Sequence, residues 1–424
     1  MRKSLVMTLM VFVLLALTAC GGNDDTGTQD VVEQTPPTAT EGGETTATGS
    51  SASQSTPGQT LELMTQTIAG TLNTSRVVTA DGLLWAWGRN TDGVLGDGTT
   101  ENQNRPVEIL DDVVAVATPN SSNATFAIRT DGTLWSWGSN TNGQLGHGLT
   151  QREASEVITP TQIMENVVHV TAGGSGTLAI TADGGLYAWG FHKYSEFEDR
   201  GESSWPTPTR IRDNIAYAVA GYGTFFYITP EGALWGWGAN DFGQVGNGER
   251  RDPGSTSGLT VRAPIHIMDN VINVGVNDIY GKAVTIDGAL WGWGFNIGGQ
   301  LGADVDRDEA VLPTRVMGKE NVAAVSVGRY HTMVLLNDGS LWAWGENERG
   351  QIGTGVAGIN ERELTPVHVM DDVVSMSARA EHSLAITSDG TLWSWGWNRE
   401  GQLGRGYPPN FGTPGKVMGG ARLP

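Results

Sequence analysis

The sequence predicts an all-β fold, a seven-bladed β-propeller of four-stranded blades. The motif Asp-Gly-x-Leu-Trp-x-Trp-Gly begins at Asp81 and recurs at steps of 50, 52, 48, 56, 51 and 51 residues, at Asp131, Asp183, Glu231, Asp287, Asp338 and Asp389. A period near 50 residues indicates an array of repeated units. Each unit contains four short apolar stretches bounded by turn residues, which predict four strands. Sixty glycines and only 17% charged residues also favour strands and tight turns over helices.

Tryptophan dominates the repeated motif. Thirteen of the fifteen tryptophans occupy its two Trp positions, and Tyr187 takes the first position of the third copy. Both positions lie on one face of the predicted strand, because strand side chains alternate. The residue between them is Gly, Ala or Ser in every copy, which indicates close approach of a neighbouring sheet. We therefore assign the thirteen to the core that holds the blades together: Trp85, Trp87, Trp135, Trp137, Trp189, Trp235, Trp237, Trp291, Trp293, Trp342, Trp344, Trp393 and Trp395.

Turn residues punctuate each unit. The Asp-Gly pair predicts a hairpin with a type I′ turn, in which both central residues have positive φ. A second signature, Asn-x-x-Gly-[Gln/Val]-[Leu/Val/Ile]-Gly, follows the Trp strand in every unit except the third, and Pro-x-x-[Ile/Val] follows in all seven. The glycine-rich signature lacks the Lys-Ser/Thr ending of a phosphate-binding loop, so we interpret it as a turn.

The two ends of the array suggest how the ring closes. The last Pro-x-x-Val, Pro414 to Val417, has no strand after it, whereas the first Asp-Gly follows two candidate strands, Leu61 to Ile68 and Arg76 to Thr79. We expect the C-terminal strand to pair with the N-terminal unit. Such pairing would close the ring and remove the free sheet edges.

The N-terminus has the pattern of an export signal: two basic residues, an apolar run too short for a comfortable membrane span, and Leu17-Thr18-Ala19-Cys20. The chain then divides into a signal peptide (residues 1–19), a disordered Thr/Gly/Ser/acidic tether (20–60) and the propeller (61–424). The cysteine segment resembles the lipobox of bacterial lipoproteins. That resemblance implies lipidation of Cys20 and an outward-facing anchor on the bacterial cell membrane; an ordinary secretory peptide is the alternative.

The chain is strongly acidic. It carries 26 Lys and Arg against 46 Asp and Glu, a net charge of -20. A field of this sign repels phosphate, so we expect no nucleic-acid partner. Cys20 is the sole cysteine, so no disulfide can form within the chain. We expect a monomer whose only membrane contact is the lipid.

No catalytic constellation is recognisable. The seven histidines do not pair at metal-ligand spacing, and four fall at repeat positions, where packing is the expected role: His266, His331, His368 and His382. The segment Asp304 to Glu309 begins like a calcium loop, but Glu309 and Arg315 replace its required Gly and Glu. A solvated acidic loop and weak calcium binding are the two interpretations. We expect no enzyme activity, no metal and no cofactor.

The repeat resembles the regulator of chromosome condensation (RCC1) family. The shared motif joins Gly-x-x-His-[Ser/Thr] to Asp-Gly-x-Leu-Trp-x-Trp-Gly-x-Asn-x-x-Gly-Gln-Leu-Gly and is clearest around His331 to Gly353 and His382 to Gly404. The resemblance covers residues 61–424 and implies a seven-bladed propeller. It also implies that an exported member binds proteins through loops on one face. The family's guanine-nucleotide exchange activity is a more distant implication, because none of its residues can be matched here.

This sequence departs from the family in several units. The family histidine is present only as His331 and His382, and the other units carry Thr74, Asn123, Gly176, Thr224 and Lys282. The third unit has an irregular segment from Phe191 to Trp205, and the fourth has an extended loop from Glu249 to Arg262.

Strand order predicts two unlike faces. Antiparallel strands running outward place the Asp-Gly turns and the acidic crossovers on one face. That face includes Asp111, Asp112, Glu165, Asp213, Asp269, Asp371 and Asp372. The opposite face collects the positions that vary between units. Loops on a rigid frame commonly carry recognition, so we expect the binding site there, with these candidates: Tyr222, Asp278, Tyr280, Arg329, Tyr330, His331, Arg379, Glu381, His382, His192, Tyr194 and Trp205.

These observations favour a surface-anchored, non-enzymatic protein that captures an extracellular protein or glycan through the variable face. The alternative is a propeller enzyme that acts on cell-wall or dietary glycan with carboxylates such as Asp278 at the channel mouth. Exchange of guanine nucleotide is a third hypothesis.

Overall fold

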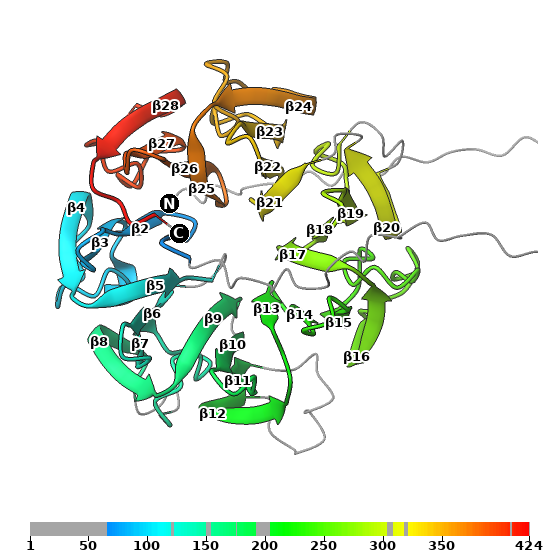
Figure 1. Cartoon of the computed structure of the whole chain (residues 1–424), viewed down its shortest axis with the longest axis horizontal. Helices are drawn as coiled ribbons and strands as arrows, with labels where there is room; N and C mark the ends of the chain where they lie inside the picture. Colours follow the sequence, from blue (N-terminus) through cyan, green and yellow to red (C-terminus); the bar gives the residue numbers. More distant parts are fainter. Residues whose placement is uncertain are drawn as a thin grey trace, which may run out of the picture. The chain divides into compact units, whose positions relative to one another are not determined.

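The computed structural model describes residues 66–119, 123–149, 154–174, 176–191, 204–302, 308–317, 321–407 and 409–423. These residues form seven four-stranded antiparallel sheets, each made of four consecutive strands. The sheets are the blades of a propeller (Figure 1), so the predicted fold class is confirmed. The predicted signal peptide, Cys20 and the tether lie outside the described residues. Within the described residues, no helix is long and apolar enough to cross a membrane.

Each blade runs from the centre of the ring to its edge (Figure 1). The innermost strands are β1 (Ile68–Gly70), β5 (Val113–Ala117), β9 (Val167–Gly173), β13 (Tyr217–Ala220), β17 (Val271–Val276), β21 (Val322–Val327) and β25 (Val373–Ala378). The second strands are β2 (Thr74–Val78), β6 (Ala124–Arg129), β10 (Gly176–Thr181), β14 (Thr224–Ile228), β18 (Tyr280–Thr285), β22 (His331–Leu336) and β26 (His382–Thr387).

The third strands carry the tryptophan motif. They are β3 (Leu84–Gly88), β7 (Leu134–Ser139), β11 (Leu186–Phe191), β15 (Leu234–Ala239), β19 (Leu290–Phe295), β23 (Leu341–Glu346) and β27 (Leu392–Gly396). The outer strands are β4 (Gln103–Leu110), β8 (Glu156–Met164), β12 (Ser204–Arg212), β16 (Thr260–Met268), β20 (Glu309–Met317), β24 (Arg362–Met370) and β28 (Phe411–Met418). One 3-10 turn, η1 (Thr91–Gly93), is the only helical element in the described part of the chain.

The two tryptophans of each motif have different environments. The second one is fully buried between blades, as Trp87 and Trp344 show at 0% exposure, whereas the first is half-buried in every blade. The small residue between them is also buried. In the fourth blade a Cβ on Gly236 would lie 2.5 Å from the Phe226 ring, so this position has no room for a larger side chain. The predicted core role of the tryptophans therefore holds most strongly for the second position.

In six of the seven blades the indole N–H of the second tryptophan joins the blade to the one before it. Trp395 Nε1 donates to the carbonyl of Gln351 (2.9 Å), and Trp344 Nε1 donates to that of Gln300 (3.0 Å). These carbonyls belong to the glycine-rich signature after the preceding Trp strand. The same bond recurs from Trp87, Trp137, Trp189 and Trp293. The signature is thus a turn, as predicted, and also an inter-blade latch.

The predicted mode of ring closure is wrong. β28 pairs with β27 of its own sheet, and the first blade obtains its inner strand from Ile68–Gly70. The seventh and first blades are instead joined by the same latch as the others, with Trp87 Nε1 donating to Gln402 O (2.8 Å). The tail after β28 adds a bridge between Thr79 and Ala421. The first blade needs no strand from the C-terminus, because β1 already completes its set of four strands.

The Asp-Gly hairpins also differ from the predicted turn type. Gly82 has a φ of 85°, but Asp81 is not among the residues with positive φ. Gly82 N donates to Thr79 O and Thr79 N donates to Leu83 O, both at 2.9 Å. This pattern is a type I turn followed by a glycine bulge. The Asp81 carboxylate accepts a hydrogen bond from the Thr79 hydroxyl (2.6 Å), which stabilises this turn.

Candidate functional site

The two ends of the propeller carry different connections. The acidic face is the end formed by the Asp-Gly turns and the crossovers between blades. These two kinds of connection are in contact there, since Val113 N donates to Gly82 O at 2.8 Å. We call loop face the opposite end, formed by the turns between first and second strands and the loops between third and fourth strands. An ion pair of 3.6 Å between Arg349 and Glu381 joins these two kinds of loop. The chain therefore separates its invariant turns from its variable ones.

The acidic face is built by turn chemistry. Its predicted crossover acids are all exposed: Asp111, Asp112, Glu165, Asp213, Asp269, Asp371 and Asp372. A hydrogen bond from the Ser340 hydroxyl (2.6 Å) lowers the pKa of Asp338, and the Thr387 hydroxyl (2.7 Å) does the same for Asp389. These carboxylates stabilise their own hairpins, so the recurrence of acids needs no ligand to explain it.

Four predicted candidates form one end of a cluster on the loop face. Tyr222 is 52% exposed in the turn between β13 and β14. The neighbouring Asp278 carboxylate is largely buried, and this desolvation raises its pKa, while the charge of Arg329 opposes the shift. Arg329 is exposed, with its guanidinium 5.2 Å from the centre of the Tyr330 ring. The structure therefore brings together three turns, from the fourth, fifth and sixth blades.

The cluster continues through the predicted candidate Glu381 and through two residues that the sequence did not single out, Arg349 and Glu346. The guanidinium of Arg349 lies 4.1 Å from the centre of the Trp397 ring and pairs with Glu381. Desolvation raises the pKa of the half-buried Glu346, and the charges of Glu348 and Glu381 add to that effect. Glu346 and Arg349 flank the Asn of the glycine-rich signature, at positions that vary between units. The sequence could have pointed to Glu346 and Arg349, because they are variable positions beside the recurring Asn and Gly of the signature.

Several predicted contact residues are buried and were assigned to the surface wrongly. Tyr280, His331 and His382 have 0% exposure, and Trp205 has 6%. Trp205 lies in β12, where it pairs with Gly190, so it belongs to a regular outer strand and not to a connecting loop. The candidates His192 and Tyr194 lie outside the described residues. Arg379 is 9% exposed and lines a central cavity instead of the loop face.

The buried histidines hold blades together. The Ser383 hydroxyl donates its only hydrogen to Gln351 O (2.8 Å), so it must accept the hydrogen of His331 Nε2 (3.1 Å). His382 makes the same link through the hydroxyl of Ser75 (3.0 Å) in the first blade. Burial lowers the pKa of both imidazoles to about 3. They are therefore neutral structural groups near neutral pH.

Strand register corrects the match of two units to the family histidine. His331 pairs with Gly345, and the residues that pair with the equivalent glycines are Tyr280 in the fifth blade and Ala124 in the second. The sequence comparison had placed Lys282 and Asn123 at those positions. The Tyr280 hydroxyl donates to His331 O (2.7 Å), so the tyrosine also links neighbouring blades. Turns of unequal length displaced the register by one or two residues.

No metal or catalytic centre emerges from the described residues. Among them no group of three His, Cys, Asp or Glu side chains could hold a metal ion. Most of the predicted calcium-like segment, residues 304–307, lies outside the described residues. What the loop face offers chemically is a set of aromatic rings, arginines and carboxylates in contact with one another. Such groups bind ligands through stacking and charged hydrogen bonds.

Comparison with known proteins identifies the family. The model of the RCC1-like domain matches residues 119–419, and the regulator of chromosome condensation (RCC1) repeat matches residues 81–122. The chain belongs to the RCC1-like family. Propellers of this RCC1-like family are mostly non-enzymatic binders or exchange factors.

The RCC1-like chain has relatives in plants and fungi. It is 30% identical over 351 residues to the ultraviolet-B receptor UVR8 of Arabidopsis thaliana, covering 80% of this chain and 66% of the receptor. It is 32% identical over 158 residues to the protein pim1 of Schizosaccharomyces pombe, covering 33% of this chain and 29% of pim1. The chain thus spans at most about two thirds of the length of these relatives.

Solved structures share the propeller. Yeast RCC1 (Prp20), in its crystal structure bound to Kap60, superposes with a TM-score of 0.70 at 20% identity, over 88% of this chain and 91% of that one. Human WBSCR16 gives a TM-score of 0.66 at 21% identity, over 79% of this chain and 94% of that one. At this identity the likeness shows the fold alone.

Proposed function

We propose that this RCC1-like protein is a surface-anchored, non-enzymatic binding protein that captures an extracellular protein or glycan through its loop face. The observation that carries the proposal is where large apolar side chains are exposed. Eight of them belong to loops of this face: Leu72, Leu149, Tyr222, Phe242, Ile297, Val356, Ile359 and Tyr407. The acidic face exposes two, Ile286 in a turn and Leu423 in the C-terminal tail. Exposed aromatic and aliphatic side chains together with Arg match the composition of protein-binding surfaces and favour a protein partner.

Anchoring belongs to the proposal and rests on sequence. Lipid on Cys20 would hold the chain at the outer surface of the cell membrane, and residues 20–60 would separate the propeller from it. Forty flexible residues have a typical reach of about 35 Å. The net charge of -20 disfavours a nucleic-acid partner. The propeller would act as a monomer, since each blade already covers its neighbours.

The loop-face cluster would supply the specific contacts. Arginine stacked on an aromatic ring is held in place before binding, so little side-chain entropy is lost when it meets a partner. Arg329 on Tyr330 and Arg349 on Trp397 are two such pairs. With Tyr222 they span four of the seven blades.

The test is capture of material shed from the surface of the source culture, with the full-length chain as bait. Replacing Tyr222, Arg329, Tyr330 and Arg349 with Ala should leave the fold intact, because none of these side chains is fully buried, and should abolish capture. A matched control replaces the exposed acids Asp111, Asp213, Asp269 and Asp371 with Asn and should capture normally.

Two outcomes would contradict the proposal. Loss of capture only in the acidic-face control would move the site to the other end of the propeller. Cleavage of a surface glycan at a pH-dependent rate that Asp278→Asn abolishes would favour the enzyme alternative, for which the raised pKa of Asp278 is the supporting observation.

A further inference from the structure

A cavity of about 390 Å³ lies among the innermost strands of the propeller. Its walls come from β5, β9, β13, β17, β21 and β25, with Gln66 just before β1 and Arg379 just after β25. Cavities that hold small molecules typically measure about 300–1,000 Å³. The space is thus adequate for one small organic ligand, and the chemistry of the wall decides which kind.

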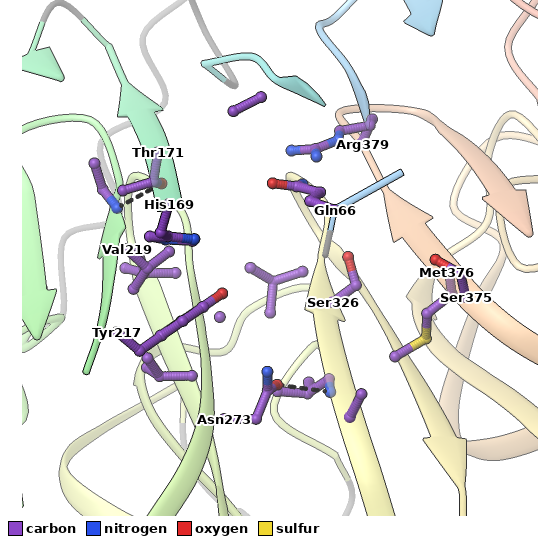
Figure 2. Close-up of a pocket in the computed structure, with 18 of the residues that line it drawn as sticks. Gln66, His169, Thr171, Tyr217, Val219, Asn273, Ser326, Ser375, Met376 and Arg379 are labelled. Atoms are coloured by element: carbon purple, nitrogen blue, oxygen red, sulfur yellow. Dashed lines mark hydrogen bonds between the residues drawn. The ribbon is translucent and has the colours of Figure 1, made fainter. Parts of the chain in front are cut away.

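Three polar side chains of the cavity wall have unused hydrogen-bonding groups. The Tyr217 hydroxyl, the Ser375 hydroxyl and the Gln66 side-chain amide make no hydrogen bond with any other described residue. Figure 2 shows the Gln66 side chain opposite the wall that carries Tyr217, whose hydroxyl points inward. Polar groups in protein interiors are normally hydrogen-bonded. Groups without a partner on a cavity wall therefore favour a polar ligand.

Other polar side chains of the wall are only partly used. Thr171 Oγ1 accepts Ala220 N (3.2 Å) and Ser326 Oγ accepts Ala378 N (2.9 Å), so each hydroxyl keeps its hydrogen and a second lone pair. Asn273 uses its amide oxygen in the same way and keeps both amide hydrogens. The wall thus offers donors and acceptors side by side. A ligand matches such a wall when its own groups both donate and accept, as hydroxyl groups do.

The wall gives a charged ligand no dedicated partner. Among the described lining residues there is no Asp or Glu, and Arg379 is the one cation. The Arg379 guanidinium already has partners, among them Ser377 Oγ, which accepts its Nε–H (2.8 Å). Burial lowers the pKa of His169 to about 4 and raises that of Tyr217 to about 12, so both are neutral at neutral pH. We therefore assign recognition to the neutral groups.

Apolar side chains lie between these polar groups. Val219, Val327 and Met376 line the same cavity, and the rings of His169 and Tyr217 stand with their centres 4.6 Å apart on one side of it. A saturated ring that bears hydroxyl groups has polar edges and apolar C–H faces. Its faces can lie against the valines and the aromatic rings while its hydroxyl groups meet the polar side chains. Pyranose sugars and cyclic polyols have this form.

We propose that the central cavity binds one neutral monosaccharide or cyclic polyol. Tyr217, Ser375 and Gln66 are its main hydrogen-bonding groups, and the apolar part of the wall lies against its ring. The site is independent of the loop-face capture proposed above, because it uses none of the same side chains. It gives the propeller a second, small-molecule ligand inside the ring.

Calorimetric titration of the full-length chain tests this site with glucose, galactose, mannose and myo-inositol. Cyclohexanol is the comparison probe, because it keeps a saturated ring and one hydroxyl group. We expect saturable binding of one molecule per chain for at least one of the four, at least about tenfold tighter than cyclohexanol, as two or more additional hydrogen bonds predict. Glucuronate, which adds a carboxylate, should bind no more tightly than the best of the four.

Three results would overturn the proposal. No saturable binding of any of the four probes would mean that only water fills the cavity. Cyclohexanol bound as tightly as the best of them would leave the polar groups without a role. Tighter binding of glucuronate would show that the site selects an anion.

Variants locate the site. Tyr217→Phe and Ser375→Ala each remove a hydroxyl that makes no hydrogen bond within the described residues, so both variants should fold. Each should weaken binding of the best probe about two- to tenfold, and the double variant at least about tenfold. Tyr187→Phe is the matched control, because it removes a phenol hydroxyl on β11, outside the cavity lining, and it should bind the probe as the wild type does.

A second variant tests the space itself. Val219→Phe fills the cavity without removing a polar group and should also weaken binding. Unchanged affinity in Val219→Phe and in the double variant would place the sugar elsewhere and overturn the assignment. All these variants should keep loop-face capture, so failure of one proposal can be told apart from failure of the other.

Discussion

At the scale of single residues, burial decides what each conspicuous side chain does. His169, His331 and His382 are all buried. His169 donates its Nε2–H to the backbone carbonyl of Ala218, and the other two histidines donate theirs to serine hydroxyls of the neighbouring blade. An imidazolium in such a site would lose its hydration without gaining an anion. The three histidines are therefore placed for packing and for inter-blade hydrogen bonds, and they remain neutral when the protein is folded.

This placement predicts a pH-dependent stability. Burial lowers the pKa of His169 from 6.5 to about 4, so between these values the unfolded chain binds one more proton than the folded chain. The free energy of unfolding should then fall as pH falls, by about 1.4 kcal/mol per pH unit for this histidine. Urea unfolding at pH 7, 6 and 5 should show a shallower pH dependence for His169→Phe than for the wild type. Equal slopes would contradict the prediction.

At the scale of elements, the contact between one Trp strand and the preceding glycine-rich loop sets the spacing of the blades. The loop also reaches the outer strand of the next blade, as where Gly355 N donates to Gly412 O (2.8 Å). Blades are thus fastened at two radii, near the middle and at the rim. This explains why the Asn-x-x-Gly signature recurs although it forms no strand.

The fourth blade provides a matched test of that latch. Trp237 Nε1 has no hydrogen-bond partner among the described residues, whereas Trp395 Nε1 donates to Gln351 O. Replacement with Phe removes the same atoms from two buried indoles, but only Trp395→Phe also loses a hydrogen bond. We expect Trp395→Phe to reduce the free energy of unfolding by about 1 kcal/mol more than Trp237→Phe in urea titrations. Equal losses would show that the latch contributes through packing alone.

At the scale of the whole molecule, the ring is closed by contacts that repeat those between the other blades, with the C-terminal tail as an addition. Ala80 N donates to Gly420 O (2.9 Å), and Arg422 N donates to Val78 O (2.8 Å). These bonds fasten the end of the last blade to the acidic face of the first. They lie outside the β-sheets and can be removed without deleting a strand.

Deleting residues 420–424 should therefore weaken the ring without unfolding it. Three backbone hydrogen bonds are lost, the two that form the Thr79–Ala421 bridge and the one from Ala421 N to Gly390 O, which predicts a fall of about 3 kcal/mol in the free energy of unfolding. Amide exchange at Ala80, whose N–H loses its acceptor, should accelerate, while the amides of Thr79, β27 and β28 keep their protection. Loss of protection in β28 would mean that the tail, and not β27, holds that strand in place.

The candidate site was predictable at the level of a face and not at the level of side chains. Tyr222, Arg329 and Tyr330 lie on the loop face as expected, since alternation of antiparallel strands determines which turns share an end. Tyr280 is the instructive error. It stands one position beyond the same kind of turn, but as the first residue of β18 it points into the gap between blades.

The repeat by itself determined the number of blades, the strands in each blade and the burial of the second tryptophan, because period, alternation and turn chemistry are local properties of the chain. Only the tertiary structure decided how the ring closes, that Arg379 turns into the cavity, and that Glu346 and Arg349 join the loop-face cluster. These facts depend on contacts between residues in different blades, distant in sequence, and on strand register, which a shift of one residue reverses.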